Sequence, residues 1–434
     1  MVKVCLARLY LLVLLIGVSA VPCAAKYGGG AGTTEEPYLI YTAAEMNQIG
    51  ANPLDWDEHF ALMADINLSV YAPDQFNLIG DASKPFAGVF DGRGHIISRF
   101  TYESSVAVGV GLFRFLDEGG IVKNLGLSEP NVTGGVVVGA LVGSVYAGGV
   151  ENCWVTGGSV DAMFQYVGGL AGDISGGTVI NCYVRGTEVT GSLLVGGLAA
   201  INDGGVVVNS LAANPVLAPG GGGGGFIGQG SAGIYADCFY DTQVSGVLTG
   251  IGDGNDPCGL TGESTANLQQ AFTFADADWD IVTSDNRAVR NIWRMCEGGI
   301  DYPHLAVEYL SADFACPDGV DAFDLAVFAD EWMVELLEAD VDFGLDHYVT
   351  FTDWATLAAA WTSTIGSADY SVHVDVAPAG GDGVIDGQDV GVFVEFWLDE
   401  GSGYLTADIE PYGGDGVVDF ADFAAFANQW LQGN

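Results

Sequence analysis

A pattern of short apolar segments returns five times between Val110 and Gly246, and this repeat constrains the fold more than any other feature of the chain. The first anchors lie at intervals of 29, 29, 28 and 28 residues: Leu112, Leu141, Leu170, Leu198 and Phe226. A second row keeps the same spacing: Asn124, Asn152, Asn181, Asn209 and Asp237. Such a period is typical of repeat architectures, in which one unit cannot bury its own apolar face but stacked units can.

The composition of each copy favours strands over helices. The copy from Val167 reads VGGLAGDISGGTVINCYVRGTEVTG, so short Val-rich runs alternate with Gly-Gly turns. We therefore predict a mainly β protein, a parallel β-solenoid of about 28 residues per turn, followed by a small all-α domain of calcium loops and helices. A leucine-rich repeat has a similar period but needs several Leu per copy, and propeller blades usually have a longer one.

These copies resemble the GLUG repeat, which is named for its Gly-Leu-x-Gly core. The segments GGLAG at 168–172 and NCYVRG at 181–186 carry the resemblance, and GALVG at 139–143 and NCWVTG at 152–157 carry it again. The last two copies depart from the pattern, because NSLAAN replaces the Cys-aromatic core and 220–225 is a run of glycine. The resemblance implies an exported or surface protein.

The regions on either side of the solenoid (110–246) read as caps. An N-terminal cap is expected over 26–109, where Thr42 and Glu45 have the spacing of a capping box for a short helix. An exit cap is expected over 247–311.

The first 25 residues read as a signal peptide, with Lys3 and Arg8 before a short apolar run at 9–18. Cys23 leaves a lipid anchor open, although Pro22 argues against one. No other apolar run is long enough to span a membrane, so we expect no span in the mature chain and a secreted or cell-surface location.

The formal net charge is −44, which excludes nucleic acid as a natural partner, because phosphate binding needs clustered Lys and Arg. Arg294 is the last basic residue, yet the acidic stretch after it carries regularly spaced Trp, Phe, Leu and Val. A folded domain with that self-repulsion needs a counter-cation.

A second repeat occupies 312–434. Four segments begin with Asp and have Trp eight residues later: Asp324 and Trp332, Asp353 and Trp361, Asp389 and Trp397, Asp422 and Trp430. The apolar residues between them fall at helical spacing, so each predicts a short amphipathic helix.

An acidic loop precedes each helix, and the last two share the pattern D-G-x-[IV]-D-x-x-D. Oxygen ligands at these positions, with Gly at the sharp turn, are typical of an EF-type calcium loop. The alternative is an acidic turn that only caps a helix. The predicted ligands of loops three and four are Asp375, Asp382, Val384, Asp386 and Asp389, and Asp408, Glu410, Asp415, Val417, Asp419 and Asp422. Those of loops one and two are Asp313, Asp318, Asp321 and Asp324, and Asp340, Asp342, Asp346 and Asp353.

These loop-helix units resemble the dockerin type I repeat, which pairs two calcium units and docks onto a cohesin partner. The resemblance implies calcium and a cohesin-like protein or another cell-surface component as partner. There are departures. Loops three and four carry three extra residues in their front half, loop two has His347 where the turn Gly belongs, and loop one is one residue short after Asp318.

No catalytic constellation stands out. A glycosidase needs two carboxylates that face one groove, and Asp173 and Asp203 are the neighbouring acids that come closest to this, although both also read as turn residues. Arg185 is the only Lys or Arg between residues 124 and 286. His95 and His304 have no metal partner at a useful spacing and read as structural.

Three aromatic residues take equivalent places, each after a Cys: Trp154, Tyr183 and Phe239. Stacked at strand spacing they could bind a polysaccharide, or they could pack inward or between coils. Cys153 and Cys182 align in the same way and read as a packed ladder rather than a disulfide. Cys258 and Cys296 are the candidate disulfide pair.

Three functions stay open. The first is a non-catalytic exported protein, in which the solenoid is a rigid spacer or binding surface and the acidic repeats are a docking module. The second is a polysaccharide-degrading hydrolase or lyase tethered by those repeats. The third is an adhesin for glycan or host protein.

Overall fold

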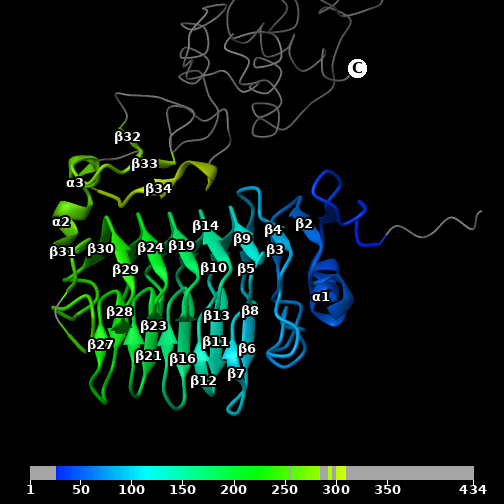
Figure 1. The fold of residues 1–434 in the computed structure, drawn as a ribbon, viewed down its shortest axis with the longest axis horizontal. Coiled ribbons are helices and arrows are strands. Elements are labelled where there is room, and N and C mark those ends of the chain that lie inside the picture. The colour runs from blue at the N-terminus through cyan, green and yellow to red at the C-terminus, as the bar shows by residue number, and fades with distance from the viewer. Residues whose placement is uncertain (1–25, 255, 284–291, 296–299, 309–434) are drawn as a thin grey trace, which may run out of the picture.

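The computed structural model describes residues 26–254, 256–283, 292–295 and 300–308. The chain coils into a parallel β-solenoid (Figure 1), which confirms the predicted fold class for this part of the protein. Each complete coil contributes one short strand to each of five sheets, which we call A to E in the order A, B, D, E, C along the chain.

Sheets A and B are the longest, with eight strands each. Sheet A contains β1 (Tyr38–Ile40), β2 (His59–Leu62), β4 (Val89–Asp91), β9 (Ile121–Lys123), β14 (Gly149–Glu151), β19 (Thr178–Ile180), β24 (Val206–Val208) and β29 (Ile234–Ala236). Sheet B contains β3 (Ile66–Asn67), β5 (Ile96–Ser98), β10 (Gly126–Ser128), β15 (Trp154–Thr156), β20 (Tyr183–Arg185), β25 (Leu211–Ala213), β30 (Cys238–Asp241) and β31 (Leu260–Glu263).

Sheets C, D and E have five strands each, one for each complete coil. Sheet C contains β8 (Phe113–Leu116), β13 (Val142–Val145), β18 (Ala171–Ile174), β23 (Ala199–Asp203) and β28 (Ile227–Ser231). Sheet D contains β6 (Thr101–Glu103), β11 (Asn131–Gly134), β16 (Ser159–Ala162), β21 (Glu188–Gly191) and β26 (Val216–Leu217). Sheet E contains β7 (Val108–Val110), β12 (Val136–Val138), β17 (Val167–Gly168), β22 (Val195–Gly196) and β27 (Gly223–Gly224).

The apolar anchors of the repeat form one row inside the solenoid, at the corner before sheet C. All five are fully buried, and their backbones are joined from coil to coil, as where the Leu170 amide donates to the Leu198 carbonyl at 2.8 Å. Since each anchor packs on its equivalent in the next coil, one copy alone would leave this row in water.

The second row of anchors marks the corner between sheets A and B. Its four Asn residues and Asp237 have φ between 46° and 52°, the left-handed region that Asn and Asp tolerate better than other L-residues. Their side chains also form a ladder: Asn181 Nδ2 donates to Asn152 Oδ1 at 3.1 Å, and Asn152 Nδ2 donates to Asn124 Oδ1 at 3.0 Å. The Asn spacing in the sequence therefore reflects a backbone requirement and a hydrogen-bond ladder at once.

Both ends of the solenoid are covered. At the N-terminal end, α1 (Ala43–Ala51) begins with the predicted capping box of Thr42 and Glu45, and η1 (Pro53–Asp55) follows it. At the other end, Ile251 forms a bridge with Ile227 of the last complete coil.

The exit cap then turns back along the solenoid (Figure 1). It contains β31, α2 (Thr265–Leu268), α3 (Ala271–Ala275), and sheet F with β32 (Ile281–Thr283), β33 (Trp293–Met295) and β34 (His304–Leu305), and ends with η2 (Ala306–Glu308). Its last residues reach the first complete coil, where a Cβ built on Gly94 would lie 2.1 Å from the Val307 carbonyl oxygen. Only glycine fits there, and its φ of +82° is also one that glycine adopts readily.

Candidate functional site

The outer face of sheet B carries the aromatic row that the sequence predicts. Trp154 pairs in register with Tyr183, Tyr183 with Leu211, and Leu211 with Phe239, so the three rings do share one row, interrupted by Leu211. The exit cap covers this row, and the relative exposures of the rings are 2%, 1% and 5%. Of the two arrangements that the sequence leaves open for these residues, the described structure has the packed one, in a buried interface with the exit cap.

Aromatic side chains of the exit cap supply the cover. Trp293 lies 6.1 Å from Tyr183 and 4.5 Å from Trp279, measured between ring centroids. Phe274 lies 5.1 Å from Phe239 in an edge-on arrangement. Such pairs add to the apolar burial of each ring, so this interface is a second core on the outside of the solenoid.

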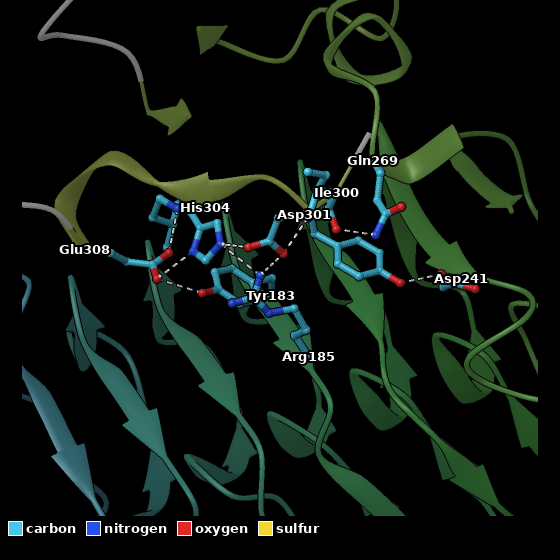
Figure 2. Close-up of polar contacts among 10 residues, drawn as sticks. Tyr183, Arg185, Asp241, Gln269, Ile300, Asp301, His304 and Glu308 are labelled. Carbon is cyan, nitrogen blue, oxygen red and sulfur yellow. Dashed lines mark hydrogen bonds and ion pairs between the residues drawn. The ribbon is translucent and has the colours of Figure 1, made fainter. Parts of the chain in front are cut away.

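A polar cluster lies beside this second core (Figure 2). Arg185 at the end of β20 donates from Nη1 to Asp301 Oδ1 at 2.8 Å. Tyr183, two residues earlier, donates from its hydroxyl to Glu308 Oε2 at 2.8 Å. Both donors therefore come from one solenoid strand, and both carboxylates come from the last described residues of the exit cap.

His304 stands between these two carboxylates. Its Nε2 is 2.9 Å from Asp301 Oδ2, and its Nδ1 is 3.2 Å from Glu308 Oε2. Arg185 Nη1 also lies 2.9 Å from Nε2, so this nitrogen faces one cation as well as one carboxylate, whereas Nδ1 faces the Glu308 carboxylate. We name Tyr183, Arg185, Asp301, His304 and Glu308 the cap clamp.

The electrostatics of the cap clamp favour its charged forms. Burial and the charge of Arg185 both lower the pKa of His304, but the hydrogen bonds with Asp301 and Glu308 outweigh them and raise it above the ordinary value. Burial likewise opposes ionisation of Asp301, yet the hydrogen bond with His304 and the charge of Arg185 lower its pKa to about 2. The cluster thus holds paired charges rather than a base poised for proton transfer.

A second polar contact fastens the far end of the exit cap. Asp241, at the end of β30, is fully buried and accepts hydrogen bonds from the Tyr302 hydroxyl at 2.6 Å and from Thr265 Oγ1 at 2.7 Å. Gln269 donates to the Ile300 carbonyl at 2.7 Å. These polar contacts set the register of the cap on the sheet. The buried rings supply most of the stabilisation, because burying one ring contributes about 1.5–3 kcal/mol, whereas a partly exposed ion pair contributes about 0–1 kcal/mol.

The sequence pointed to part of this site. Arg185 stands out as the only cation in its stretch, and His304 reads as structural, as it is. The roles of Asp301, Glu308 and Trp293 were missed, because nothing local in the sequence shows that the exit cap turns back over sheet B. The motif DYPHLAVE at 301–308, with its acids three and four residues from a His, is the one signal that could have shown the clamp.

The neighbouring acids of the solenoid lie in two places. On sheet C, burial and the nearby charge of Asp203 raise the pKa of Asp173, although Ser175 donates to its carboxylate at 2.6 Å. On sheet D, burial and Glu188 raise the pKa of Asp161. A partly buried carboxyl beside another acid takes up a proton more readily than an isolated, exposed one, and this holds for both Asp173 and Asp161.

The three aligned cysteines that precede the aromatic row are buried and free. Cys153 donates from Sγ to the Glu151 carbonyl at 3.2 Å, and Cys182 repeats this contact one coil later with Ile180 at 3.3 Å. Burial raises the pKa of the Cys238 thiol to about 12, so these thiols act as small core residues.

The predicted calcium loops, the signal segment and Cys296 lie outside the described residues. Within the described part, no three His, Cys, Asp or Glu side chains are arranged to hold a metal ion. A helix of the length and apolarity needed to cross a membrane is likewise not found among these residues.

No family model matches the chain. A stretch of 132 residues is 36% identical to a protein of Evansella cellulosilytica named "Putative Gly-rich membrane protein", and the match covers 29% of this chain and 15% of that protein. Another of 133 residues is 35% identical to halomucin of Haloquadratum walsbyi and covers 30% of this chain and 1% of that protein. This chain therefore spans only a small part of these relatives. The crystal structure of a "putative immunoglobulin A1 protease" from Bacteroides ovatus aligns with a TM-score of 0.42 and 19% identity, covering 65% of this chain and 95% of that one.

Proposed function

We propose that this chain is a non-catalytic exported or cell-surface protein, in which the solenoid is a rigid spacer or binding surface and the acidic repeats are a calcium-stabilised, dockerin-like docking module. The exit cap is the observation that carries the proposal. The exit cap covers the outer face of sheet B over several coils, and its last described residues lie beside the first complete coil. An element that clamps successive coils together stiffens a scaffold.

The relatives support the location. One is named as a membrane protein and the other as a halomucin, and both match this chain over a stretch the size of the solenoid. The GLUG-like segments point the same way. Detection of the protein on intact cells with an antibody, before and after protease treatment of the cell surface, tests this; a signal that appears only after lysis would contradict it.

Calcium binding is tested on the full chain. Asp386→Asn with Asp419→Asn removes one carboxylate from each of the two loops that carry the D-G-x-[IV]-D-x-x-D pattern, and we expect calcium titration calorimetry to lose most of its heat. Asp161→Asn with Glu188→Gln makes the same charge change on the solenoid and should leave the titration unchanged. Equal titrations for all three proteins would rule out these loops as the calcium site.

The docking role needs a partner of cohesin type or another surface component. Capture of such a partner in calcium, and its release by a chelator, is the expected result. If the partner is captured equally well with a chelator present and by the protein with the two Asn substitutions, the acidic repeats are not the docking module. The scaffold role of the solenoid would be unaffected by that result.

A polysaccharide-degrading activity is the second candidate, and Asp173 is the observation that favours it. Its partly buried carboxyl beside Asp203 is the arrangement from which a general acid is made. Incubation with a polysaccharide panel would show reducing ends or unsaturated products that Asp173→Asn abolishes. If products are absent from the wild-type reaction, the non-catalytic proposal holds.

A further inference from the structure

The outer face of sheet A carries apolar side chains on three neighbouring strands. In β24, Val207 is fully buried inside the solenoid, whereas Val206 and Val208 point outward and are partly exposed. The strands on either side extend this surface, because Thr178 and Ile234 pair with Val206, and Ile180 and Ala236 pair with Val208. We call this set the apolar face of sheet A: Thr178, Ile180, Val206, Val208, Ile234 and Ala236.

This residue pattern is that of a covered sheet. A parallel strand that is buried on both faces reads as a continuous apolar run, whereas a strand with one face in water alternates apolar and polar residues. Sheet D alternates, because β16 and β21 place Asp161 and Glu188 outward. β24 reads Val-Val-Val and does not alternate. We therefore expect a cover over sheet A, just as the exit cap covers the apolar row on the outside of sheet B.

The described chain ends beside sheet A. Val307 packs against Gly94, which lies in the corner between β4 of sheet A and β5 of sheet B. Residues 309–434 continue from this corner. Four coil steps lead from β4 to β24, a distance of roughly 20 Å at the spacing of neighbouring strands. An extended stretch such as 309–323 reaches up to about 50 Å, so the residues that follow it can lie over sheet A.

The first two acidic repeats, 312–361, have the side chains that such a cover needs. Glu151 pairs with Ile180 at one border of the apolar face, and Asp203 and Asp237 precede and follow its strands. A cover must therefore meet the face with uncharged side chains. In the two predicted helices, uncharged residues fall at i, i+3, i+4 and i+7, the spacing of one helix side: Leu325, Phe328, Ala329 and Trp332, and Trp354, Leu357, Ala358 and Trp361.

These two repeats also have a weaker calcium pattern than the last two. Loop two has His347 in place of the turn Gly, and loop one is one residue short after Asp318. A loop-helix unit with an incomplete ligand set gains less folding free energy from the ion. Burial of the apolar helix sides against sheet A would stabilise these units instead.

We infer that the first two acidic repeats dock on the apolar face of sheet A through the uncharged sides of their helices. The inference rests on the acidic repeats of the proposed docking module, but not on calcium binding. Docking joins the first pair of repeats to the solenoid. The last pair, which carries the D-G-x-[IV]-D-x-x-D pattern, then remains available for calcium and a partner.

Photo-cross-linking of the full chain tests this docking. The photoreactive amino acid p-benzoylphenylalanine replaces Val208 in one protein and Thr133 in the matched control, because Thr133 also points outward and is partly exposed, but on sheet D. Dilute protein is irradiated, and proteolytic peptides are identified by mass spectrometry. We expect position 208 to form a cross-link to 312–361 within the same chain, and position 133 to form none to that segment.

A substitution provides the second measurement. Val208→Asp places a charge on the apolar face, so it should speed protease cleavage within 312–361 several-fold, whereas Thr133→Asp should leave the rate unchanged. Thermal unfolding shows that each variant is folded before rates are compared.

The inference is overturned if position 208 forms no cross-link within the chain, or if its cross-links join two chains or reach only 389–430. Equal cleavage rates for Val208→Asp and Thr133→Asp overturn it as well. A full chain that fails to bind calcium would remove the proposed calcium sites, yet the cross-link from position 208 would remain, so the two proposals fail separately.

Discussion

The Tyr183 hydroxyl and the Glu308 carboxylate meet at 2.8 Å although 125 positions separate them in the chain. The tyrosine belongs to a solenoid strand, and the glutamate belongs to the last described turn of the exit cap. The same carboxylate also contacts His304 and accepts a hydrogen bond from the Leu305 amide at 2.6 Å. Loss of the tyrosine hydroxyl would leave one oxygen of a largely buried carboxylate with a single partner.

Tyr183→Phe is expected to lower the free energy of unfolding by about 1–2 kcal/mol, because the largely buried Glu308 carboxylate loses one of its donors while the ring packing is kept. Urea unfolding followed by tryptophan fluorescence measures this. The control is Tyr146→Phe at a more exposed ring, which should change the midpoint little. Equal effects of the two substitutions would show that the contact with Glu308 does not stabilise the protein.

Trp293→Ala should loosen the exit cap before the solenoid unfolds. Trp293 is fully buried between Tyr183 and Trp279, and truncation of a buried Trp costs about 3–5 kcal/mol. We expect earlier protease cleavage within 260–308 and greater quenching of the remaining tryptophans, with the β-sheet circular dichroism unchanged. Phe272→Ala in α3, where the ring is 61% exposed, is the control; cleavage as fast as in Trp293→Ala would argue against a specific role for Trp293.

Two substitutions of Asn152 test the corner ladder, and we expect the alanine variant to be less stable than the glycine variant. Both Asn152→Gly and Asn152→Ala lose its side-chain bonds with Asn124 and Asn181. Alanine must also adopt a φ of 49°, at a further cost of about 1–2 kcal/mol, whereas glycine adopts it freely. The alanine variant should therefore unfold at lower urea. Identical midpoints would mean that the backbone conformation at this corner is not what selects Asn.

The pH dependence of the exit cap follows from His304 and Asp301. The pKa of His304 is raised above 6.5 by its two carboxylate partners, despite burial and the opposing charge of Arg185. Its stabilisation is therefore complete below pH 6.5 and is lost as pH rises through the folded value. The pKa of Asp301 is lowered from 3.8 to about 2, so its contribution is complete above pH 3.8 and fades toward pH 2. The cap should be held most firmly between pH 3.8 and 6.5.

Urea unfolding of the cap near about pH 5 and about pH 9 measures this difference. His304→Gln keeps a polar side chain but cannot take up a proton, so it should flatten the pH dependence above neutrality. A wild-type midpoint that is the same at both values would contradict the assignment of the charged form to His304.

The solenoid could be predicted because its information is local and periodic. Each Leu or Phe anchor recurs at one coil length, and each corner Asn meets a backbone requirement that its own residue type reveals. The cover over Trp154 and Tyr183 could not be predicted in the same way. It depends on contacts with Trp293 and Leu305, more than 100 positions later, where no period links the two segments.

The acids illustrate the same limit. The repeat spacing places Asp173 and Asp203 in neighbouring coils, and the charge of Asp203 adds to burial in raising the pKa of Asp173. Asp241 reads as another solenoid acid in the sequence, yet it is fully buried and satisfied by Tyr302 and Thr265. Its role arises only once the exit cap has turned back, so the sequence around it carries no sign of burial.

The doubling back of the exit cap also fixes how the molecule would carry a mechanical load. Residue 27 packs against the first strands, and Val307 lies against Gly94 in the first complete coil. Tension applied between these two points is therefore borne by the first coil and by the interface under the exit cap, while the later coils stay outside the direct line of force. A force transmitted through the acidic repeats would separate the exit cap from the aromatic row before it disrupted the stacked coils. The cap would therefore dissociate first and protect the solenoid from unfolding.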